Sequence, residues 1–66
     1  MGKQILRMPA VCKKTGRGRS AIYVDIAKGM FPPPIKIGER SSGWIEDEIE
    51  QWIEDRIAAS RDVEGI

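Results

Sequence analysis

Three consecutive prolines near the middle of the chain, Pro32–Pro34, restrict its fold more than any other feature. Proline has no backbone N–H and its ring sets φ, so this run cannot lie inside a helix or a central strand. We expect residues 30–34 to run extended, with the Phe31 side chain turned into the core. Helices and strands must therefore lie on either side of this segment.

The residues before the prolines predict a short first helix. Pro9 suits a first helical turn, because its missing N–H would have no partner within the helix. A helix over residues 10–15 then ends at Gly16, a position where the left-handed conformation is usual. Ahead of it, the apolar run at residues 5–7 indicates an initial strand or arm.

A second helix is expected over residues 19–28, after a turn at residues 16–18. Ile22 and Ile26 lie four positions apart and give this helix one core-facing stripe. Gly29 is a typical helix stop. Two short helices joined by a glycine-containing turn form the helix-turn-helix pattern.

A β-hairpin is expected after the prolines. Ile35 and Ile37 alternate with Lys36, which predicts a strand with both isoleucines on one side. Residues 38–43 are rich in glycine and serine and predict a turn, and residues 44–45 return as the second strand. Such a hairpin beside a helix-turn-helix is a wing.

A third helix is expected to begin near Asp47, which together with Glu50 resembles a capping box. Its buried stripe follows helical spacing and consists of Ile49, Trp52, Ile53 and Ile57. Trp44 and Trp52 fall among Ile37, Ile49 and Ile53, so both indoles are expected in the core rather than stacked on bases. After Ala59 the chain is expected to fray.

These elements predict a mainly α fold with a small β-hairpin: a winged helix-turn-helix of three helices plus a wing. We expect one domain over residues 1–60 and a flexible tail over residues 61–66.

The order of these residues resembles a known family. Ile22-Tyr23, Gly29, the run 31–38, Arg40, Gly43-Trp44 and a helix with Trp52 are similar to the AlpA family of prophage regulators and excisionase-like proteins. The resemblance runs from Ile5 to Ile57 and implies a MerR-like winged helix that binds DNA. Members often have arginine after the tyrosine, whereas this chain has Val24 and then Asp25. The departure implies one DNA contact fewer and a carboxylate near the site.

Composition excludes several classes of protein. The 66-residue chain has one cysteine, Cys12, and no histidine, so neither an intrachain disulfide nor a zinc site is expected. Cys12 fits either a small buried residue or a surface thiol. With no histidine and little room for a pocket, we expect no enzyme, cofactor, metal or small-molecule substrate. No apolar stretch approaches a membrane span, and we expect a cytoplasmic protein at the bacterial nucleoid.

Charge is divided sharply along the chain. Residues 1–40 hold nine basic and two acidic side chains, whereas residues 41–66 hold two basic and eight acidic ones. Such asymmetry favours one half that faces nucleic acid and another that faces solvent or a partner.

The candidate DNA-binding residues lie in the first two helices, their turn and the wing. In helix-turn-helix proteins the start of the second helix meets base edges while neighbouring groups contact phosphates. The tyrosine hydroxyl could contact a phosphate, or its ring could pack against the wing. The candidates are Lys13, Lys14, Arg17, Arg19, Ser20, Tyr23, Lys36, Arg40, Ser41 and Ser42.

The sequence therefore predicts sequence-specific binding of double-stranded DNA by a prophage or genomic-island transcriptional regulator. An excisionase-type factor that bends or coats DNA for an integrase is the alternative. A protein-interaction module acting through the acidic third helix is the alternative from another class. A core this small also favours a homodimer or a cooperative oligomer on DNA.

Overall fold

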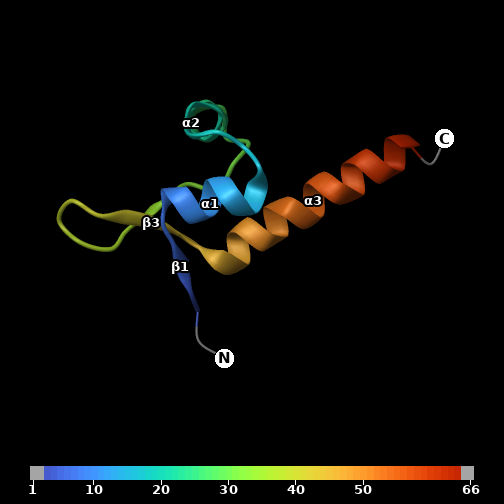
Figure 1. Ribbon diagram of the computed structural model, residues 1–66. Helices are drawn as coiled ribbons and strands as arrows, with labels where there is room; N and C mark the ends of the chain where they lie inside the picture. Colours follow the sequence, from blue (N-terminus) through green and yellow to red (C-terminus); the bar gives the residue numbers. More distant parts are fainter. Residues whose placement is uncertain (1–2, 65–66) are drawn as a thin grey trace.

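Two short helices, three short strands and one long helix make up residues 3–64, the part of the chain that the computed structural model describes; side chains are described for residues 3–61 (Figure 1). The two short helices precede the proline run, and the long helix follows the sheet. In chain order the elements are β1 (Ile5–Leu6), α1 (Met8–Thr15), α2 (Arg19–Ala27), β2 (Ile35–Lys36), β3 (Ser42–Ile45) and α3 (Glu46–Glu64).

Glycines end the two short helices, as expected. Gly16 has φ 75° and its N–H donates to the Cys12 carbonyl at 2.8 Å, so the left-handed residue closes α1. Gly29 follows α2 with φ 74°. Pro9 lies in the first turn of α1, where its missing N–H costs nothing. The predicted helix-turn-helix is confirmed.

β3 is the centre of a three-stranded antiparallel sheet (Figure 1). On one side it pairs with β1, Leu6 opposite Trp44, and on the other with β2, Ile35 opposite Gly43. The strand expected near the N-terminus and the hairpin wing are therefore both present. The turn of the wing is shorter than predicted, because Ser42 and Gly43 already belong to β3.

The close pairing of β1 with β3 depends on Gly43. A Cβ added there would lie 2.5 Å from the Ile5 Cγ2 atom and 2.9 Å from the Leu6 carbonyl oxygen. Both distances are shorter than van der Waals contact, so only glycine lets the two backbones approach this closely.

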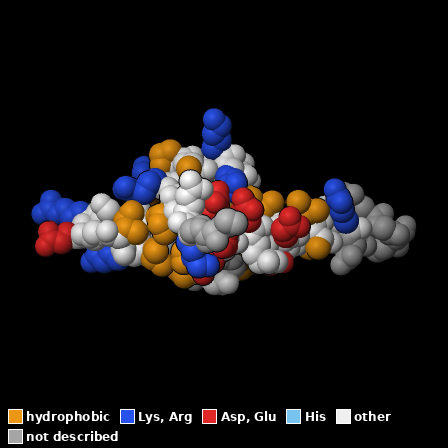
Figure 2. Space-filling model, turned by 90° about the horizontal axis from the view of Figure 1, so that it is seen from below, with side chains coloured by type: hydrophobic (Ala, Val, Ile, Leu, Met, Phe, Trp, Pro, Cys, Tyr) orange, Lys and Arg blue, Asp and Glu red, His pale blue; other side chains and the backbone are white. Residues whose placement is uncertain are grey.

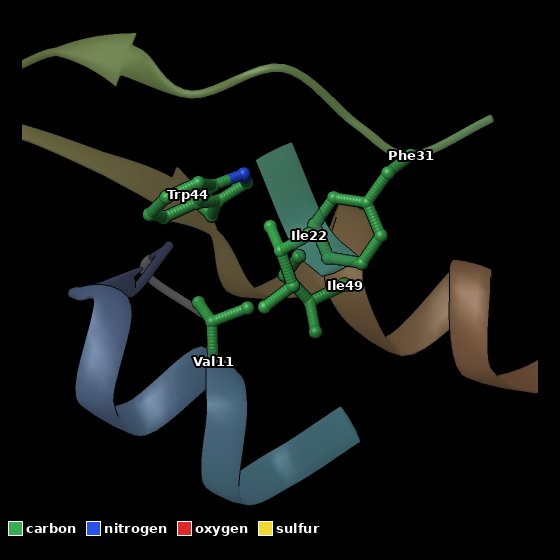
Figure 3. Packing of buried hydrophobic residues seen from close by; sticks show 5 residues of the cluster. All are labelled: Val11, Ile22, Phe31, Trp44 and Ile49. Atoms are coloured by element: carbon green, nitrogen blue, oxygen red, sulfur yellow. The ribbon is translucent and has the colours of Figure 1, made fainter. Parts of the chain in front are cut away.

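Five apolar side chains form the buried core, and each comes from a different segment (Figure 3). The helices and β3 each contribute one residue, and the extended segment before β2 contributes the phenylalanine. The five are Val11, Ile22, Phe31, Trp44 and Ile49. The predicted burial of Phe31 and Trp44 is confirmed. Because the core is so small, α1, α2 and β3 each contribute one buried side chain to it, and a few half-buried ones pack around them.

Two indoles fasten the extended segment to the rest of the fold. Trp44 Nε1 donates to the Pro32 carbonyl and Trp52 Nε1 to the Met30 carbonyl, each at 2.9 Å. Phe31 and Trp52 also meet edge to face, with ring centroids 5.0 Å apart. The prolines cannot donate backbone hydrogen bonds, so their segment is held by bonds that its carbonyls accept.

The prediction that Ile37 joins the core is wrong. Ile37 is 44% exposed and Ile35 is 37% exposed. β2 lies at an edge of the sheet, and the five core side chains come from other segments. Trp52 and Ile53 are half-buried and pack against the core, as does Cys12.

The start of α3 also differs from expectation. The helix begins at Glu46 directly after β3, so Asp47 lies inside the first turn and is not an N-cap. The Asp47 carboxylate lies 3.4 Å from Lys3 Nζ, and the Glu50 carboxylate contacts Lys14 instead of closing a capping box. Three acidic residues in the first turn nevertheless suit the positive end of the helix dipole.

The far end of α3 extends beyond the predicted limit at Ala59. The helix continues through Glu64 and projects away from the rest of the chain (Figure 1). Residues 60–64 contain neither glycine nor proline, so nothing in the local sequence stops the helix. Ile57 is 40% exposed, because the packed stripe ends at Ile53. Residues 65 and 66 of the expected tail lie outside the described residues. None of the helices described is long and apolar enough to span a membrane.

Candidate nucleic-acid interface

α2 has one face in the core and one face exposed. Ile22 is fully buried and Ile26 packs against the core, which orients the helix. Arg19, Ser20 and Tyr23 are exposed, and Tyr23 is 53% exposed. The second helix thus presents its candidate DNA-binding side chains to solvent, and nearly all its apolar anchoring comes from two isoleucines.

Arg17 is engaged within the fold. Its Nη2 lies 2.8 Å from an Asp25 carboxylate oxygen, and the Asp25 side chain is only 16% exposed. Asp25 follows Tyr23 by two residues, which places it about 200° further around the helix. The guanidinium is therefore held on the side of α2 away from Tyr23. The carboxylate that the family resemblance placed near the site is the partner of this arginine.

An open recess brings the exposed face of α2 together with the wing. Arg19 and Tyr23 line one side, and Arg40 and Ser42 of the wing line the other. Pro34 and Trp44 also line it. Residues predicted separately from two segments of the chain thus meet in one site. The Tyr23 ring lies beside the wing while much of its surface remains exposed.

Arg7 also lines this recess, although it is not among the DNA-binding residues that the sequence predicts. It precedes α1 as its N-cap residue with an extended backbone, φ −92° and ψ 169°. Pairing of β1 with β3 places the start of α1 beside the wing. Its only sequence signal is its membership of the basic half of the chain, because the strand pairing that moves it here joins residues about 40 positions apart.

The remaining candidates of the wing are exposed or lie in its turn. Lys36 in β2 is exposed opposite Ser42 of β3. The Ser41 carbonyl accepts the Ile37 N–H at 2.9 Å, which closes the turn. Figure 2 shows that the wing end of the molecule carries acidic as well as basic side chains.

The two lysines of α1 differ in their surroundings. Lys14 Nζ lies 2.9 Å from a Glu50 carboxylate oxygen and 3.8 Å from one of Glu46. The hydrogen bond and charge of Glu50 raise the Lys14 pKa above its ordinary value, with Glu46 adding to the effect. Lys13 is exposed. Lys14 therefore joins α1 to α3, whereas Lys13 is available to a partner.

The three helices, the wing and the recess between them define a small winged helix, a class of DNA-binding fold. No group of histidine, cysteine or acidic side chains within the described residues could hold a metal ion.

The chain belongs to the AlpA family: the model described as "Prophage CP4-57 regulatory protein (AlpA)" matches residues 4–57. It is 41% identical over 59 residues to the DNA-binding transcriptional activator AlpA of Escherichia coli strain K12, covering 80% of this chain and 84% of that protein. It is also 37% identical over 59 residues to uncharacterized protein ORF88 of Enterobacteria phage P4, covering 89% and 67% respectively. No solved structure gives a significant match.

Proposed function

We propose that this protein binds double-stranded DNA and regulates transcription from a prophage or genomic island. The observation that carries the proposal is the meeting of the exposed face of α2 with the wing around one basic recess. Membership of a family of prophage regulatory proteins supports it. So does the relative in Escherichia coli that is described as a DNA-binding transcriptional activator.

In the proposed complex α2 enters the major groove and the wing lies over the adjoining minor groove. Arg19 and Ser20, in the first turn of α2, are placed to meet base edges. Arg40 at the wing supplies the guanidinium that a narrow minor groove favours. Lys13 and Lys36 contact phosphates on either side. The acidic α3 points away from the DNA, and the protein acts at the nucleoid in the cytoplasm.

Arg17 has a different role in this proposal from the one its position in the turn suggests. Because Asp25 holds its guanidinium at 2.8 Å, a base contact would first require breaking that ion pair. Arg19 therefore carries more of the base recognition, and Arg17 orients the turn before α2.

The direct test is the affinity for duplex DNA as a function of salt. Selection from a random duplex pool supplies a preferred sequence, and a shuffled duplex of the same composition is the control. Phosphate contacts release counterions, so log K should fall linearly with log salt, and the selected duplex should bind about 10³-fold or more tighter. Affinity that is weak and independent of salt on both duplexes would contradict the proposal and favour a protein-interaction module.

A promoter reporter and an excision assay distinguish a regulator of transcription from a factor that promotes excision. A reporter fused to the promoter that contains the selected sequence should respond to the protein and lose the response in Arg19→Ala. An unchanged reporter together with protein-dependent excision by an integrase would instead favour the recombination factor.

Self-association on DNA remains a prediction. α3 as a whole carries eight of the ten acidic residues and exposes Ile57 on its projecting part, so it offers a surface to the basic half of another copy. Sedimentation of the protein alone and with a selected duplex should show two or more chains per duplex. A single chain in both states would overturn this part of the proposal.

A further inference from the structure

Three arginines from three different elements surround the recess between α2 and the wing. Arg7 comes from the start of α1, Arg19 from the first turn of α2, and Arg40 from the wing. Among the described side chains, no acidic one lines the recess. Three like charges around one hollow repel each other, so the arrangement is stabilised when an anion lies between them.

None of these three guanidinium groups is satisfied within the part of the chain whose side chains are described. The ion pairs found among residues 3–61 use Lys3, Lys14 and Arg17 as the basic partners. The arginines of the recess, by contrast, have no carboxylate partner there. Their donors are therefore free for a ligand that fits guanidinium groups.

The chemistry of the lining selects a phosphate group. Guanidinium forms paired N–H···O hydrogen bonds with phosphate oxygens. The Tyr23 and Ser42 hydroxyls at the same recess are neutral donors that suit the remaining oxygens. The recess is half-open, so a phosphate that belongs to a polymer can reach it from solvent.

The position of the recess identifies that polymer. When a recognition helix lies in the major groove and a wing lies over the next minor groove, the strand separating the two grooves must pass between them. That strand presents its phosphodiester groups, and the recess lies between α2 and β3.

We propose that this recess binds a backbone phosphate of double-stranded DNA, and that Arg7 is a phosphate-binding residue of the interface. The proposal rests on the proposed DNA-binding function and adds a phosphate site between α2 and the wing, in which Arg7 is the phosphate ligand while Arg19 and Arg40 at its edges keep their contacts with the grooves. Arg7 contributes equally on every sequence, because a phosphate carries no base identity.

Arg7→Gln tests the assignment, with Arg61→Gln as the matched control. Both substitutions remove one positive charge from an exposed side chain, but Arg61 lies on α3, outside the lining of the recess. Binding to the selected and the shuffled duplex is measured between 0.05 and 0.3 M salt. For Arg7→Gln we expect the salt slope to fall by about 0.9 and affinity at 0.1 M to fall about fivefold to tenfold on both duplexes. Arg61→Gln should leave slope and affinity close to those of the parent.

Two further measurements separate the loss of a phosphate contact from a general loss of charge or of folding. Arg7→Lys keeps the charge, so it should restore the slope while regaining only part of the affinity. Urea unfolding should show that Arg7→Gln folds as the parent does, since the side chain is exposed.

Several results would overturn the proposal. One is an equal dependence of affinity on salt in Arg7→Gln and Arg61→Gln. Another is a loss of affinity confined to the selected duplex, which would make Arg7 a base-reading residue. Saturable binding of inorganic phosphate that depends on Arg7 and blocks the duplex would assign the site to a small anion. If the parent binds neither duplex, the proposed function itself fails, a result distinct from a parent that binds and an Arg7 variant that behaves like the control.

Discussion

Substitution of Gly43 by alanine tests whether the close approach of β1 to β3 sustains the fold. The added Cβ would lie 2.5 Å from Ile5 Cγ2 and 2.9 Å from the Leu6 carbonyl oxygen. The Ile5 side chain is 38% exposed and can rotate away, but the Leu6 oxygen belongs to the backbone of a paired strand. Reaching ordinary contact requires β1 to retreat by about 0.5 Å or more.

The Gly43→Ala substitution lowers the free energy of unfolding because the added methyl group overpacks a site that cannot relax freely. Such changes destabilise by about 1–3 kcal/mol, and the entropic gain of replacing glycine offsets about 0.4–1 kcal/mol. We expect a net loss of about 1–2 kcal/mol, which for a domain of this size lowers the Tm by about 10 °C. This loss is a large share of the total free energy of unfolding, which is roughly 3–10 kcal/mol for a domain of 66 residues.

Thermal unfolding followed by circular dichroism measures this loss, and Gly38→Ala is the control. A Cβ at Gly38 would lie 3.6 Å from the nearest atom, the Ser41 Cβ, so that variant should stay within about 0.5 kcal/mol of the parent. Adding Ile5→Ala to Gly43→Ala should recover part of the loss, since the Leu6 contact remains. Equal Tm values for the two alanine variants would refute the reasoning.

Two ion pairs give the remaining predictions. Arg17 and Asp25 are replaced by alanine singly and together, and the free energy of unfolding of each variant is measured in urea. We expect a coupling free energy of about 1 kcal/mol, because the Asp25 side chain is mostly buried and that of Arg17 is half-exposed. Strictly additive losses would contradict a structural role for the pair. The Lys14 pKa is raised by Glu50, so its contribution is present below the ordinary value of 10.5 and is lost as pH rises through the raised value. The urea midpoint of the parent should therefore fall more steeply above pH 10.5 than that of Lys14→Gln, and parallel pH profiles would show that the contact contributes nothing.

Local signals in the sequence predict most of the fold. Pro9, Gly16 and Gly29 act within one helical turn of their own positions, so the limits of α1 and α2 follow closely from residue type. The three prolines, together with the alternation of apolar and basic residues after them, locate the wing. The end of α3 is predicted less well, because the sequence there contains no stop signal while its apolar stripe ends at Ile57.

The arrangement of the site depends on contacts that such signals do not report. Arg7 reaches the recess only because β1 pairs with a strand about 40 residues later. Arg17 pairs with a carboxylate eight residues away across a turn, and Lys14 with one on α3. Charge composition predicts that the first 40 residues face nucleic acid, but it does not distinguish an arginine held by a carboxylate from one that is free.

The division of α2 into a buried and an exposed face bears on how such regulators diversify. Substitutions on the outer face, at Ser20 or Val24 for example, touch none of the five core side chains and should change stability by no more than about 0.5 kcal/mol. Changes at Ile22 remove a side chain on which α1, α2 and α3 all rely. The base-contacting face of this helix can therefore change its DNA preference at little cost in stability, while changes on the inner face disturb the core that holds all three helices.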